Sequence, residues 1–273
     1  MTATIKRNSR DRQPGNMLAV DLRRMFTSRY FYVLLGVALV IPVLILVMTT
    51  MMDSGVSVDP STGAETAAEA FENVWQAIGT LPGAATGAGA ATGGGMSMTS
   101  MCNINLVYFL AAILVGIFVC DDFRSGYCKN LFAVRSKKAG YVASKTIASF
   151  VGGGLMLICF FIGAIIGGAI SGLPFEMSGF NIGNLILCMI SKILLMAVFA
   201  GIYVLTGVIG KQRLWLAVLL SLGVGMFLFN IIPTVTPLDA TFMNVILCLV
   251  GGVLLGGGLG VVSRAVLDHF DIL

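Results

Sequence analysis

Six long apolar segments most strongly constrain what this chain can fold into. They cover residues 30–52, 101–120, 146–171, 185–209, 214–233 and 241–262. A helix needs about 20 mostly apolar residues to cross roughly 30 Å of hydrocarbon, and every segment has that length. The run 33–47 is apolar throughout and lacks the alternation of a membrane β-strand. The sequence therefore predicts an all-α, polytopic membrane protein with six transmembrane helices.

Composition excludes the other broad classes. Hydrophobic residues make up 57% of the 273 residues and charged residues 11%, which excludes both a soluble globular domain and a disordered chain. The 34 glycines against seven prolines favour helices that approach closely. Glycines four residues apart, Gly163 with Gly167 and Gly252 with Gly256, mark close-packing surfaces, either inside the bundle or between subunits.

Positive charge predicts the orientation. Sixteen of the 17 Lys and Arg residues lie before the first segment, between the second and third, between the fourth and fifth, or after the last. The remaining connections, 53–100, 172–184 and 234–240, contain no Lys or Arg. Because cytoplasmic loops are enriched in Lys and Arg, both termini are predicted to be cytoplasmic.

The segments outside the six runs differ in character. Residues 1–15 predict a flexible basic tail near anionic head groups, and 263–273 predict a cytoplasmic C-terminal tail. The outer loop, 53–100, contains residues 64–78, which suit a short helix, and a Gly-rich run over 79–95. That run is either a linker or a cover over an outer exit.

Residues 16–29 predict an amphipathic helix ahead of the first span. Leu18, Leu22, Met25 and Phe26 recur at helical spacing with charged residues between them. Such a helix lies in the membrane interface. It is either a general anchor or an element with a specific docking role.

The residue inventory argues against catalysis on this chain. The single histidine is His269, and no Asp or Glu lies inside any of the six segments. Metal-ligand pairs, a Ser-His nucleophile and an aspartyl protease centre therefore lack their residues. The phosphate-binding pattern is also missing. We predict no catalytic residue, no metal site, no cofactor and no nucleic-acid partner.

Lys192 is the one charge inside a predicted span. It lies about seven residues, or roughly 10 Å, from the outer boundary, and inserting a central lysine costs up to about 3 kcal/mol. The side chain either snorkels to the outer interface or faces a polar path and attracts an anionic part of a substrate. Phe109 and Phe227 complete the candidate substrate path.

The cytoplasmic loop 121–145 has a helical pattern of its own. Phe123, Tyr127 and Leu131 fall at i, i+4 and i+8, which predicts one apolar stripe on a short helix. Gly126 inside that helix points to a close backbone approach. The loop is either an ordinary basic loop or a transverse helix that docks on a soluble partner.

The same loop resembles the cytoplasmic loop of bacterial type-2 ABC exporter permeases. The resemblance lies in the acids after the second span, Ser125-Gly126, Asn130-Leu131, Arg135 with Lys137-Lys138, and Tyr141 with Lys145. The amphipathic segment 17–29 is similar to the connecting helix of that family. The plan of six spans with cytoplasmic termini also fits.

The resemblance implies a type-2 ABC exporter permease fold in a bacterial cytoplasmic membrane. Its partners would be P-loop ATPase subunits, which carry the ATP and Mg, a second permease chain, identical or related, and the lipid bilayer. The coupling helix would contact the ATPase through Asp122, Phe123, Arg124, Gly126, Tyr127, Asn130, Leu131 and Arg135. Part of residues 230–242 would supply the re-entrant helices common in the family.

The expected cargo is an amphipathic or peptide-like molecule moved outward, such as an antimicrobial or signalling peptide or a lipid-like molecule. Two other functions remain open. One is a secondary transporter that works without ATP. The other is a non-transporting membrane subunit, such as a sensor or immunity protein.

Overall fold

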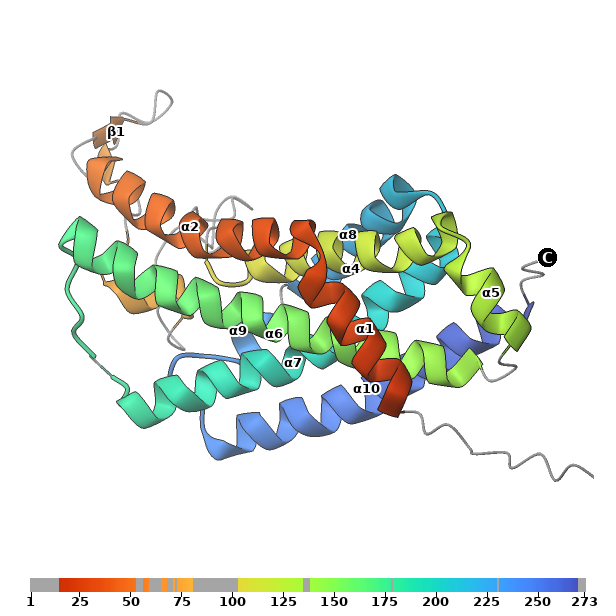
Figure 1. Cartoon of the computed structure of the whole chain (residues 1–273). Helices are drawn as coiled ribbons and strands as arrows, with labels where there is room; N and C mark the ends of the chain where they lie inside the picture. Colours follow the sequence, from red (N-terminus) through yellow and green to blue (C-terminus); the bar gives the residue numbers. More distant parts are fainter. Residues whose placement is uncertain are drawn as a thin grey trace, which may run out of the picture.

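Helices dominate the computed structural model of the chain (Figure 1). It describes residues 15–52, 56–58, 65–67, 71, 73–80, 103–134, 138–177, 179–229 and 231–269. The helices are α1 (Gly15–Thr27), α2 (Arg29–Met52), α4 (Leu106–Arg124), α5 (Tyr127–Val134), α6 (Lys138–Ser171), α7 (Ile182–Gly210), α8 (Leu214–Phe229), α9 (Ile232–Val235) and α10 (Phe242–His269). The predicted helical class is confirmed.

The described residues of the loop 53–100 form small elements. Strands β1 (Val56–Val58) and β2 (Glu65–Ala67) pair antiparallel, with Ser57 opposite Thr66. The 3₁₀ helix η1 (Val74–Ala77) follows them. The prediction of a short helix over 64–78 is therefore wrong at β2, which is a strand. The described helical part of this segment is the single turn η1.

Five helices, not six, are long and apolar enough to cross a membrane. They are α2, α4, α6, α7 and α10, among the residues that the structure describes. The fifth expected span, 214–233, becomes α8, whose 16 residues reach about 24 Å, and the short α9. Pro233 lies in the first turn of α9, where its missing N–H is tolerated, but it cannot extend α8 as a regular helix. The chain is nonetheless a membrane-embedded helical protein.

Two helices extend past their expected ends. α6 begins at Lys138 rather than at 146, and α10 runs on to His269, so most of the expected C-terminal tail is helical. Lys138 joins these extensions, because its Nζ donates to the Leu267 carbonyl at 2.7 Å and lies 3.4 Å from Asp268. The expected tail at 1–15 falls outside the described residues except for Gly15.

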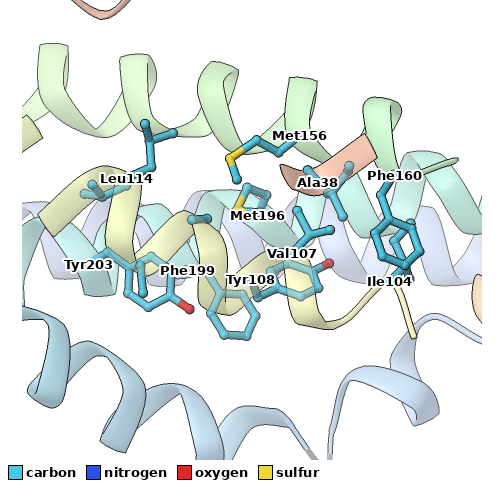
Figure 2. Packing of buried hydrophobic residues seen from close by; sticks show 14 of the residues in the cluster. Ala38, Ile104, Val107, Tyr108, Leu114, Met156, Phe160, Met196, Phe199 and Tyr203 are labelled. Atoms are coloured by element: carbon cyan, nitrogen blue, oxygen red, sulfur yellow. The ribbon is translucent and has the colours of Figure 1, made fainter. Parts of the chain in front are cut away.

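Helix α7 is the centre of the bundle and contacts α4, α6, α8 and α10. Figure 2 shows its Phe199 and Tyr203 among buried side chains of α4 and α6. The Phe199 and Tyr108 rings lie 4.5 Å apart between centroids. The packing around α7 fixes the positions of the buried polar side chains that lie next to it.

The paired glycines lie at helix contacts within the chain. A Cβ on Gly163 would collide with the Leu39 carbonyl of α2, and one on Gly167 would lie 2.8 Å from the Val43 Cα. On α10, a Cβ at Gly252 or Gly256 would lie 3.2 Å from a carbonyl oxygen of α7. The glycines thus let α2 approach α6, and α10 approach α7.

The bundle has two distinct ends (Figure 1). α1, α5, the α7–α8 turn and the C-terminal part of α10 lie at one end, which we call the basic end. β1 and the α6–α7 connection lie at the other, the opposite end. One cluster of buried charged groups lies at the basic end, and a buried lysine with polar partners lies in the half of α7 towards the opposite end.

Candidate functional site

The chain turns sharply between α4 and α5. α4 ends at Arg124, and Gly126 has a φ of +72°, in the left-handed region that favours glycine. A Cβ at Gly126 would meet nothing within 4 Å. The expectation of one continuous helix with a close backbone approach is therefore wrong: glycine is needed here for the conformation that redirects the chain into α5.

The expected contact residues of the loop differ in exposure. Arg124 and Asn130 are exposed, whereas Gly126 is half-buried. The aromatic and apolar members are half-buried, and two of them, Phe123 and Leu131, pack against the core. Arg135 lies outside the described residues. The surface that α5 offers to a partner is therefore polar and basic.

Asp122 is fully buried and pairs inside the protein. Its Oδ1 lies 2.8 Å from the Arg24 guanidinium of α1, and its Oδ2 lies 2.7 Å from Lys145 Nζ of α6. The Tyr141 hydroxyl donates to the same Oδ2 at 3.1 Å. The assignment of Asp122 as a partner-contacting residue is therefore wrong, because no part of its side chain reaches the surface.

A second carboxylate completes this group. Asp21 of α1 lies 3.1 Å from Lys145 Nζ and accepts a hydrogen bond from the Ser144 hydroxyl. The two carboxylates, Asp21 and Asp122, balance the two cations, Arg24 and Lys145. We call these four residues the balanced cluster; it joins α1, α4 and α6 at the basic end.

Aromatic rings extend the balanced cluster to α5. The Arg24 guanidinium lies 4.4 Å from the ring centroid of Tyr127, the first residue of α5. Burial opposes the charge on Arg24, but the neighbouring Asp122 raises its pKa overall. Burial also raises the pKa of Tyr127, and that of the Cys128 thiol to about 12. Both groups are neutral at ordinary pH.

Helix α1 faces the bundle differently from its predicted amphipathic pattern. Its buried side is formed by Met17, Asp21 and Met25, at i, i+4 and i+8, while Phe26 is exposed. The pairing of Asp21 with Lys145 was not predicted from the sequence. The available signal was an acid spaced four residues from two methionines.

Lys192 lies roughly 15 Å along α7 from its start at the opposite end and is only 1% exposed. Its Nζ donates to the Thr236 hydroxyl at 2.9 Å and makes a longer contact of 3.5 Å with Asn105 Oδ1. The snorkelling interpretation is therefore wrong. Within the described part of the chain, no ion pair joins Lys192 to a carboxylate.

Other hydrogen bonds fix the surroundings of Lys192. The Tyr108 hydroxyl donates to the Lys192 carbonyl at 2.9 Å, and the Thr236 hydroxyl donates to the Ile232 carbonyl at 2.8 Å. The Cys188 thiol lies 3.6 Å from the Thr236 carbonyl. Lys192, Thr236 and Asn105, here called the unbalanced cluster, thus join α7 to the start of α4 and to the end of α9.

The two aromatic path residues differ in exposure. Phe109 is half-buried in α4, and Phe227 of α8 is 83% exposed. Phe227 therefore faces lipid or another chain rather than the interior. The described residues also contain no group of three or more His, Cys, Asp or Glu placed to hold a metal ion.

Comparison with known proteins gives no assignment for this arrangement. No protein-family model, curated protein or solved structure matches the chain. The geometry of the two clusters and of α5 therefore carries the functional argument.

Proposed function

We propose that this chain is the transmembrane permease subunit of a type-2 ABC exporter, powered by separate P-loop ATPase subunits. One observation carries the proposal. Helix α5 lies at the basic end, with its own Asn130 and the preceding Arg124 exposed. Its Tyr127 contacts Arg24 of the balanced cluster. This is a polar docking surface with a rigid connection to the spans.

The balanced cluster suits the transmission of a partner's motion. A force on α5 reaches α4 through the Gly126 turn and reaches α1 through the Arg24–Tyr127 contact. Separating the buried charges would strand an unpaired ion, which costs about 3–5 kcal/mol. We infer that α1, α4, α5 and α6 move together when a partner displaces α5.

The remaining parts of the proposal follow from the same assignment. The basic end faces the cytoplasm, in a bacterial cytoplasmic membrane, in keeping with its Lys and Arg residues. A second permease chain, identical or related, completes the path, and the exposed Phe227 lies on a face available to it. ATP and Mg belong to the ATPase. The cargo class is an amphipathic peptide or lipid-like molecule.

Gentle purification of the tagged chain from its native cell, with mass spectrometry of co-purifying proteins, tests the proposal. A P-loop ATPase is expected with wild type and is expected to be lost with the double variant Arg124→Ala/Asn130→Ala. Arg213→Ala is the matched control, because Arg213 is exposed in the α7–α8 turn at the same end. Absence of an ATPase from well-folded wild type would contradict the proposal and favour a non-transporting subunit.

The unbalanced cluster favours a second candidate function. A secondary transporter needs an ionisable group inside the membrane, and Lys192 is a buried amine without a carboxylate partner in the described chain. Uptake into native membrane vesicles separates the two. Dependence on ATP supports the exporter, whereas dependence on an ion gradient alone supports the secondary transporter.

A further inference from the structure

Among the residues that the structure describes, the hydrogen-bond partners of the Lys192 ammonium group are neutral oxygens. Thr236 and Asn105 supply a hydroxyl and an amide oxygen, at 2.9 and 3.5 Å. Asp239 lies on the α9–α10 connection, as does Thr236. It makes no ion pair with Lys192 in the described chain, and one of its carboxylate oxygens is buried without a hydrogen-bond partner. Burying a charge without a counter-charge costs several kcal/mol. An anion placed beside Lys192 would offset this cost.

Residues 73–80 form a cover at the opposite end of the bundle. Backbone hydrogen bonds join this segment to three other parts of the chain: Val74 N–H to the Pro174 carbonyl, Ile104 N–H to the Ala77 carbonyl, and Leu238 N–H to the Thr80 carbonyl, at 3.3, 2.8 and 3.0 Å. The cover therefore joins the α6–α7 connection, the start of α4 and the α9–α10 connection.

Side chains anchor the cover as well. Trp75 is 6% exposed, its Nε1 donates to the Phe175 carbonyl at 3.2 Å, and its ring lies 5.8 Å from the Phe175 ring. A Cβ on Gly79 would lie 3.2 Å from the Leu238 side chain. The cover contacts Ile104 and Leu238. Ile104 directly precedes Asn105, and Leu238 lies two residues after Thr236. Asn105 and Thr236 are the two partners of Lys192. The cover and the unbalanced cluster thus share their supports.

We propose that Lys192 binds the anionic head group, a carboxylate or phosphate, of an amphipathic molecule, and that residues 73–80 close this site until the cover moves. The apolar part of the ligand is required because Ile78, Ile104 and Leu238 around the cluster are buried and apolar. The proposal rests on the proposed function in that the ligand is the transported molecule. Its test needs no ATPase.

Equilibrium binding of labelled laurate and dodecyl phosphate to the purified chain in a non-ionic detergent tests the site. Lys192→Gln keeps a donor for Thr236 and Asn105 but removes the charge, and it should weaken binding by at least about tenfold. Lys192→Arg keeps the charge and should bind within a few-fold of wild type. The stronger of the two probes identifies the head group.

Cys188 gives a second measurement, because it lies one helical turn from Lys192. In a chain whose other cysteines are replaced by serine or alanine, a membrane-impermeant thiol reagent should label Cys188 slowly. Trp75→Ala should speed labelling several-fold by loosening the cover. Dodecyl phosphate should then slow labelling in Trp75→Ala but not in Trp75→Ala/Lys192→Gln.

Three results would overturn the proposal. The first is equal binding of the anionic probes to wild type and Lys192→Gln, and the second is equal competition by dodecyltrimethylammonium, since neither would require the charge. The third is Cys188 labelling that is unchanged by Trp75→Ala. Anion binding without any co-purifying ATPase would instead contradict only the exporter assignment.

Discussion

Lys145 and Lys192 are the same residue type at almost the same burial, 0% and 1% exposed, on helices that pack together. Lys145 contacts two carboxylates, whereas Lys192 contacts a hydroxyl and an amide. Burial alone therefore does not reveal the role of an intramembrane lysine. The partners do: a balanced ammonium holds helices together, and an unbalanced one is suited to bind an anion.

Removing Lys145 should have the largest effect on stability. Lys145→Met leaves Asp21 and Asp122 buried with one remaining cation, and we expect a loss of about 3–5 kcal/mol. Unfolding of the purified chain in mixed detergent measures it. A loss no larger than that of Lys192→Gln would show that the balanced cluster is not structural.

Restoring the charge balance should recover much of that loss. Lys145→Met/Asp21→Asn keeps the Arg24–Asp122 pair intact, and we expect it to be about 2 kcal/mol more stable than Lys145→Met alone. Asp121→Asn, in an exposed acid next to the cluster, is the control and should recover nothing. Additive effects of the two cluster substitutions would argue against direct coupling.

Arg24→Ala should cost less, about 1–2 kcal/mol. The Arg24 side chain is one-third exposed, so water can replace part of its interaction with Asp122. The same unfolding measurement checks the value. The predicted order, Lys145→Met before Arg24→Ala, would be contradicted by the reverse order.

Lys192→Met should change the free energy of unfolding by less than about 1 kcal/mol. The substitution removes an ammonium that makes no ion pair among the described residues, so it separates no charge pair there. Matched unfolding curves for Lys192→Met and Lys145→Met measure the contrast. A similar, large loss in both variants would erase the distinction between the two clusters.

The Cys128 thiol reports the smallest effect, a change in reactivity. Because burial raises its pKa to about 12, its thiolate fraction at pH 8 should be on the order of a thousandfold below that of an ordinary thiol. Its alkylation rate should keep rising with pH towards 12 in the folded chain, but level off above about pH 9 in denaturant. Mass spectrometry of Cys128 measures the rate; fast alkylation at pH 8 in the folded chain would contradict the burial.

The apolar runs predicted the membrane helices because a spanning helix leaves a continuous signal in the sequence. Pro233 gives a local reason why the run at 214–233 does not form one helix. The length of the apolar run by itself did not indicate this break. The balanced cluster was not predictable in this way, since Asp21 and Lys145 are 124 residues apart (145 − 21). Only the packing of α1 on α6 brings them together.

In the candidate site, too, some residues stand out in the sequence, whereas their contacts do not. Lys192 was singled out because a charge in an apolar run is conspicuous, yet its partner Thr236 lies 44 residues away and gave no signal. Asp122 was chosen from a loop pattern that does not reveal burial. Gly126 was recognised as special, but the sequence does not distinguish close approach from a positive φ.

Photo-crosslinking from α5 in the native cell tests most directly whether α5 docks on a P-loop ATPase. A photoreactive amino acid replaces the exposed Asn130, and the same probe at the exposed Arg213 is the control. We expect an adduct at Asn130 that contains a P-loop ATPase, and none at Arg213. A folded, membrane-inserted chain that yields no ATPase adduct at Asn130 would contradict it.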